Sequence, residues 1–117
     1  MTSLERARAF ALSLPEATEE PHHDMSSFRV RGKIFATVPP DGEHLHVFLD
    51  EPEAVAWAAE NPDGCELLRW GKRVAGLRVA LGEAPDDLVR ELLEESWHRR
   101  APKKLAAERD RTRSAPG

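Results

Sequence analysis

The sequence predicts an α+β fold: one domain in which an antiparallel sheet of about five strands carries helices packed on one face. Three observations predict it. The 117 residues suffice for one hydrophobic core but not for two ordinary domains. Apolar residues recur at every second position in the central regions, and they recur at helical spacing near both ends. We expect the domain at residues 1–108, followed by a basic, flexible tail at residues 109–117.

The first helix is expected at residues 3–13, where apolar side chains recur at helical intervals. Thr2 and Glu5 have the spacing of a capping box, and Pro15 closes the segment. Residues 16–25 are polar, lack periodicity and contain a proline. We therefore expect a surface loop there.

Three antiparallel strands are expected next, at residues 26–30, 33–38 and 44–49, because apolar and polar side chains alternate in each. Arg31-Gly32 separates the first two strands and predicts a tight hairpin turn. The breaker PPDG separates the second strand from the third.

A second helix is expected after Asp50, which is placed to cap it, and before Asn61-Pro62, which ends it. Two further strands flank a turn at Gly71-Lys72-Arg73, in the segments CELLRW and AGLRVAL. The longest helix begins at Pro85-Asp86 with an apolar face that includes Trp97, and Pro102 interrupts it.

Several separated segments agree in order and spacing with one known family. They are LPEATEEPHHDMSSFRVRGKIFATVPPDG, HVFLDEPEAVAWAAENPDG, the pair Trp70-Gly71 and the ending ESWHRRAPKKLAAE. On these segments the chain resembles the MmcQ/YjbR family over roughly residues 4–108.

The resemblance implies a CyaY-like fold, and it implies a family often described as DNA-binding through a proposed double-wing arrangement. Frataxin-type proteins of the same fold bind iron through an acidic ridge on the first helix. That ridge is absent here, since the first helix offers only Glu5 against Arg6 and Arg8. Iron delivery is therefore not expected.

Alternation divides the three central strands into two faces. The face expected to pack on the helices consists of Phe28, Val30, Ile34, Ala36, Val38, Leu45, Val47 and Leu49. The opposite face consists of Arg29, Arg31, Lys33, Phe35, Thr37, His44, His46 and Phe48. Basic groups there would hold phosphates while Phe35 and Phe48 offer stacking planes, as in proteins that bind single strands. The alternative is a sheet face that is solvated or covered by the loop or tail.

The C-terminus concentrates positive charge in a chain whose net charge is −4. Residues 97–117 carry seven basic and two acidic side chains. Among them, Lys103 and Lys104 are expected to add phosphate contacts, although the acidic net charge argues against nucleic-acid binding. The alternative is that basic residues at a helix end only complement the helix dipole.

A second hypothesis is a protein-interaction or small-ligand domain that does not bind nucleic acid. It would use the loop around His22 and a pocket near Trp70. A tryptophan of so small a domain more often serves the core, which is the alternative for Trp70.

No motif for metal, cofactor or catalysis accompanies these residues. His44 and His46 share a strand face, but no standard ligand spacing joins them, so no metal and no cofactor are expected. Cys65 has no base nearby in sequence and is expected to be a small buried hydrophobe. We expect a non-enzymatic binding module.

Composition and apolar patterning also indicate the location of the protein and its class of partner. The sequence has no signal-peptide core, no apolar run of about 18 residues and one cysteine, so we expect a cytoplasmic protein with no membrane partner. DNA or another nucleic acid is the expected partner, and a monomer is favoured.

Overall fold

Strands dominate the first two thirds of the chain and helices the last third, and the computed structural model describes residues 2–114. In chain order the elements are α1 (Leu4–Ser13), β1 (Ala17–His22), β2 (Met25–Val30), β3 (Lys33–Val38), β4 (His44–Phe48), α2 (Glu51–Glu60), β5 (Cys65–Trp70), β6 (Arg73–Ala80), α3 (Asp86–Arg100) and α4 (Lys103–Ser114). None of the helices in residues 2–114 has the length and apolar character that a membrane span requires.

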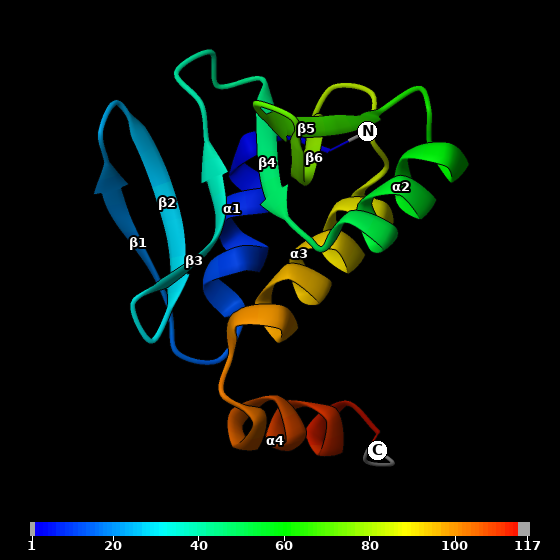
Figure 1. Cartoon of the computed structure of the whole chain (residues 1–117). Coiled ribbons are helices and arrows are strands. Elements are labelled where there is room, and N and C mark those ends of the chain that lie inside the picture. The colour runs from blue at the N-terminus through cyan, green and yellow to red at the C-terminus, as the bar shows by residue number, and fades with distance from the viewer. Residues whose placement is uncertain (1, 115–117) are drawn as a thin grey trace.

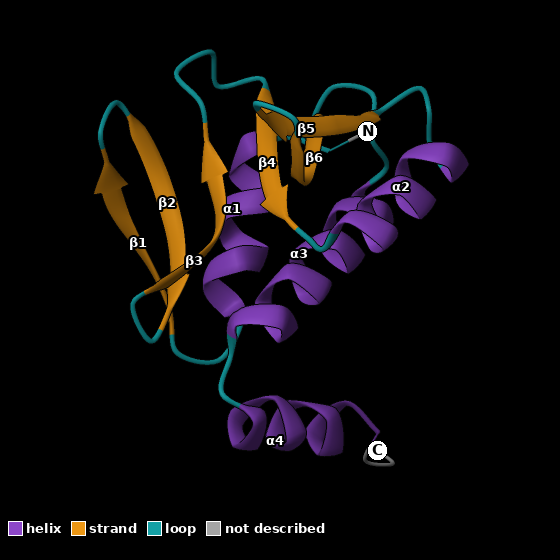
Figure 2. Ribbon diagram, in the orientation of Figure 1, coloured by secondary structure: helices purple, strands orange, loops and turns teal. Residues whose placement is uncertain are grey.

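The six strands form one antiparallel sheet in the order β1-β2-β3-β4-β6-β5. Helix α3 contacts β3, β4 and α1, while α2 contacts β5 and β6 (Figure 1). Figure 2 shows the helices α1, α2 and α3 gathered beside the sheet, with α4 set apart below. Buried side chains of the sheet and helices form one core. The predicted α+β fold is confirmed, with one strand more than expected.

The additional strand is β1, so the expectation of a surface loop at residues 16–25 is wrong. β1 pairs with β2 along its whole length. It lies at the sheet edge, where its side chains are half-buried or exposed and need no apolar alternation. Pro21 is compatible with an edge strand, because an outward N–H has no ladder partner to lose. Glu19 accepts hydrogen bonds from Arg8 and Ser26, which fix the strand through polar contacts.

The first helix ends at Ser13 as predicted but begins one residue later, at Leu4, with a different cap. Ser3, not Thr2, is the N-cap, and its hydroxyl accepts a hydrogen bond from the backbone N–H of Arg6 at 3.2 Å. The backbone N–H of Thr2 donates instead to Ala84, which ties the start of the chain to the segment before α3. The predicted limits of α2 and α3 are confirmed at Asn61 and before Pro102.

Helix α4 follows the Ala101-Pro102 break and includes residues 109–114, part of the expected tail. Leu105 is buried in the core and Ala106 packs against it, so the helix is attached to the domain through few apolar contacts. Residues 115–117 of the expected tail lie outside the described residues.

A bulge in β3 inverts the predicted faces of two residues. Phe28 pairs with Ala36, but the next pair is Arg29 with Ile34, so Phe35 is an extra residue in its strand. Its side chain is fully buried in the core with ring centroid 6.4 Å from that of Phe28. Phe35 is therefore not on the outer face, and Ile34 is not on the helix-packed face.

The remaining predicted core residues of these strands are buried as expected. They are Phe28, Val30, Ala36, Val38, Leu45, Val47 and Leu49. The alternation rule fails at the bulge, because the inserted residue shifts Ile34 and Phe35 relative to Ala36 and Val38, which keep their predicted face.

Candidate functional site

A shallow hollow of about 380 Å³ brings together residues from several elements, and we call it the Trp70 hollow. Its lining consists of His22, Arg29, Gly32, Lys33, Ile34, Phe48, Trp70 and Arg100. These residues come from β1, the β2–β3 hairpin, the end of β4, the end of β5 and the last turn of α3. The Trp70 hollow therefore contains candidate residues of both hypotheses from the sequence, the nucleic-acid-binding face and the ligand pocket.

Two tight hairpin turns position the lining. Arg31 and Gly32 have φ angles of 52° and 81°, as in the type I′ turn that suits a two-residue hairpin, and this turn leads directly into Lys33. Between β5 and β6, Gly71 has φ 64° at the first turn position. This turn sets Trp70 directly opposite Arg73, so the two side chains leave the sheet on the same face.

Trp70 is the exposed aromatic residue of the hollow. It is 55% exposed, whereas Phe48 is 8% exposed and lies against it with ring centroids 5.3 Å apart and planes tilted by 56°. Phe48 therefore supports the indole and is not itself the open stacking surface that the sequence suggested. By contrast, Trp97 is fully buried in the core and donates its indole N–H to the carbonyl of Pro15.

The hollow carries cations without acidic partners. Arg29 donates to the hydroxyl of Ser27 at 3.0 Å, and its other hydrogen bond goes to the backbone carbonyl of Pro21. Among the described residues, neither Arg29, Lys33 nor Arg100 has an ion-pair partner, and no carboxylate lines the hollow. Anions of a ligand would meet uncompensated positive charge here.

Arg100 is a partly buried cation in the last turn of α3. Its Nε is buried and finds no hydrogen-bond partner within residues 2–114. Burial, with a contribution from the adjacent Arg99, lowers the pKa of Arg100 below its ordinary value. An acceptor anion near this guanidinium would relieve that unfavourable environment.

Further basic residues surround Trp70 at the β5–β6 tip, which we define as Arg69–Arg73. Arg69, Lys72 and Arg73 are all exposed. In the described part of the chain no carboxylate forms an ion pair with any of them. From the sequence, Gly71-Lys72-Arg73 was expected only as a turn and Arg100 only as part of the C-terminal basic cluster, although the run Arg69-Trp70-Gly71-Lys72-Arg73 signals a turn with basic flanks.

Other predicted site residues lie elsewhere. Arg31 forms a bidentate ion pair with Glu16, whose pKa this hydrogen bonding lowers, so the charge of Arg31 is already compensated. Lys103 and Lys104 are exposed in the first turn of α4 but do not line the hollow. Arg99 of the C-terminal cluster pairs with Asp50 at 2.8 Å.

His44 and His46 belong to a polar network on the sheet. The Nδ1 of His44 lies 2.9 Å from Asp41, and the Nε2 of His46 accepts a hydrogen bond from Arg78 at 3.0 Å. Burial first, and then the Arg78 cation, lowers the pKa of His46. Within residues 2–114, no group of three or more His, Cys, Asp or Glu side chains is arranged to hold a metal ion.

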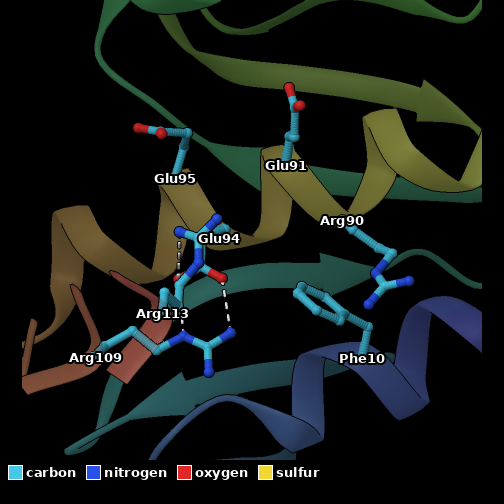
Figure 3. A pocket seen from close by; sticks show the side chains of 7 residues that line it. All are labelled: Phe10, Arg90, Glu91, Glu94, Glu95, Arg109 and Arg113. Atoms are coloured by element: carbon cyan, nitrogen blue, oxygen red, sulfur yellow. Dashed lines mark hydrogen bonds and ion pairs between the residues drawn. The ribbon is translucent and has the colours of Figure 1, made fainter. Parts of the chain in front are cut away.

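A second hollow of about 380 Å³ lies among α1, α3 and α4 and is drawn in Figure 3. There Arg109 donates two hydrogen bonds to Glu94, at 3.0 and 3.2 Å, and Arg113 lies 3.8 Å from the same carboxylate. Arg90 lies over the ring of Phe10 (Figure 3). Three arginines here face three glutamates, so this hollow lacks the charge excess of the Trp70 hollow.

Comparison with known proteins gives a family and one described fold. The family model described as YjbR matches residues 12–99. Among solved structures, the Deinococcus radiodurans protein DR2400, described as a DUF419 domain, is similar with a TM-score of 0.70 and 20% identity. The alignment covers 85% of this chain and 78% of that one. The search of curated proteins finds no match.

Proposed function

This chain belongs to the YjbR family, and we propose that it is a non-enzymatic module that binds nucleic acid through the Trp70 hollow. The observation that carries the proposal is an exposed indole among cations that have no acidic partner within the described residues. Guanidinium and ammonium groups bind phosphate oxygens, and an aromatic ring offers a plane to a base.

The local charge supports the proposal despite the net charge of −4. Arg29, Lys33 and Arg100 line the hollow, and Lys72 and Arg73 are exposed next to Trp70 in the β5–β6 hairpin. Phosphate binding depends on this local cluster rather than on the average over the surface. The acidic remainder of the molecule would confine the nucleic acid to this patch.

The residue types in the hollow also support a binding role rather than catalysis. His22 is the one imidazole of the lining, and the lining includes no carboxylate, serine or cysteine from the described residues. General acid–base or nucleophilic chemistry would require such groups within hydrogen-bond reach of each other.

The proposal is tested by fluorescence anisotropy with labelled oligonucleotides over a series of salt concentrations. The double variant Arg29→Ala plus Lys33→Ala is expected to bind more weakly, because it removes two phosphate contacts. The slope of log K against log salt should become shallower by about one per lost contact.

The matched control is Arg90→Ala plus Arg111→Ala, which removes the same charge from exposed positions on α3 and α4. We expect this control to retain most of the affinity. Equal losses in both variants would indicate only long-range charge, and absence of binding at low salt would overturn the proposal.

The small-ligand alternative now uses the same hollow, because His22 and Trp70 both line it. Its volume of about 380 Å³ is within the range of small-molecule sites, roughly 300–1,000 Å³. This alternative would replace nucleic-acid binding if a small anionic aromatic compound bound in the hollow while oligonucleotides did not.

A further inference from the structure

We propose that the partner is a single strand, with an unpaired base stacked on Trp70. This inference rests on the proposed function and specifies its substrate class. The feature that points to it is the position of Trp70, an indole more than half exposed at the end of a strand and supported on one side by Phe48.

Trp70 is held in place before any ligand binds. It is the last residue of β5, it pairs with Arg73 across a two-residue turn, and the ring of Phe48 contacts it. A ring on paired strands loses little conformational freedom on stacking, so the favourable energy of the contact is retained. Exposing so large an apolar surface is otherwise unfavourable in water.

Along its length, an undistorted duplex offers this ring no open base. Its bases are already stacked and paired, and it presents phosphates and groove edges to a protein surface. An unpaired base has an open π-face, and stacking on an aromatic side chain contributes about 1–3 kcal/mol per base. The exposed indole thus favours a strand whose bases are free.

The cations lie where a single strand would need them. In the sheet order, Phe48 on β4 is central. Arg29 on β2 and Lys33 on β3 lie on one side of it. Arg73 on β6 and then Trp70 on β5 lie on the other side. Adjacent strands are about 4.8 Å apart, so this row spans about 19 Å from β2 to β5. A short single strand crossing the strand ends would meet phosphate-binding groups along this row and the indole of Trp70 at its end.

The surface around the Trp70 hollow is less favourable for a duplex, which is wider than a single strand. Helix α2, which packs on β5 and β6, carries Glu51, Glu53 and Glu60 on exposed positions. Arg31, at the tip of the other hairpin, is already paired with Glu16. These acidic groups would repel the second phosphate backbone of a duplex that came near them.

The test compares a labelled oligothymidylate of about 20 nucleotides with a blunt duplex of the same length, at one low salt concentration. Three variants are measured: Trp70→Ala, Trp70→Phe and the control Leu12→Ala, which removes a similarly exposed apolar side chain from α1. Circular dichroism confirms that each is folded.

We expect the single strand to bind at least about tenfold more tightly than the duplex. Trp70→Ala should weaken single-strand binding about tenfold and leave duplex binding unchanged, because only the free base uses the ring. Trp70→Phe, which keeps an aromatic plane, should lose less, and Leu12→Ala should lose nothing.

Duplex binding as tight as single-strand binding, or an equal loss of both in Trp70→Ala, would overturn this inference. In that case the proposed function still stands if Arg29→Ala plus Lys33→Ala weakens duplex binding while its charge-matched control does not. Absence of binding to either oligonucleotide would overturn both.

Discussion

The aromatic residues of this chain differ sharply in burial. The helical periodicity of α3 predicts Trp97 in the core, and the structure confirms it. Trp70 could not be placed in this way, because a residue at the last position of a strand, beside a turn, has no following side chains to define its face. Phe35 was placed wrongly, since alternation cannot reveal a bulge.

Phe35 gives the first residue-scale prediction. Its side chain is fully buried against Phe28, so Phe35→Ala should lower the free energy of unfolding by about 3–5 kcal/mol, as a large-to-small substitution in a core does. Urea denaturation measures the loss. Val55→Ala, at a residue 45% exposed on α2, is the control and should change stability by less than about 0.5 kcal/mol. A loss below about 1 kcal/mol for Phe35→Ala would place its ring on the outer face instead.

Among the elements, those with apolar periodicity could be predicted and those held by polar contacts could not. The limits of α2 and α3 and the pairing of β2 with β3 follow from caps, prolines and alternation. β1 was not predicted because it is a polar edge strand without apolar alternation. Its strand conformation depends on pairing with β2. The docking of α4 depends on Glu94, whose partner Arg109 is 15 positions away along the chain.

That contact leads to a prediction for α4. Glu94 is 6% exposed and accepts two charge-assisted hydrogen bonds from Arg109. Glu94→Ala removes both, and since α4 has few apolar contacts, its amides should exchange hydrogen about tenfold faster or more. Hydrogen–deuterium exchange with mass spectrometry measures this for residues 103–114.

The control for α4 is its neighbour Glu95→Ala, because Glu95 is exposed and forms none of these hydrogen bonds. The exchange of α1 serves as an internal reference in both variants. Unchanged exchange of α4 in Glu94→Ala would mean that the Leu105 contact and the pair of Asp110 with His98 hold this helix without Glu94.

At the scale of the whole molecule, the fold was more predictable than the site. Local patterns determine helices, strands and hairpins, and these suffice for an α+β sheet with one helix-packed face. The Trp70 hollow joins His22, Lys33 and Arg100 across most of the chain length, and no local pattern contains that proximity. Most residues that line the hollow were candidates from the sequence, but they belonged to two rival hypotheses. The candidates also included Arg31, His44 and His46, which have other partners.

At the same scale, an uneven distribution of charge reconciles the acidic net charge with the anion binding that we propose. The net charge is −4, yet the paired cations on the helical side are compensated by Asp86, Asp50 and Glu94, while those of the hollow are not paired within residues 2–114. Binding should therefore be local and salt-sensitive.

The most direct test of binding at the hollow is a titration followed by nuclear magnetic resonance of the tryptophan indole N–H signals. The chain has three tryptophans, and only Trp70 lines the hollow, so Trp57 and Trp97 are internal controls. Trp70→Phe assigns its signal. On addition of a short oligothymidylate, we predict that the Trp70 signal shifts in proportion to binding while the other two stay in place. A titration that saturates while the Trp70 signal stays fixed, or that moves all three signals alike, would contradict the account.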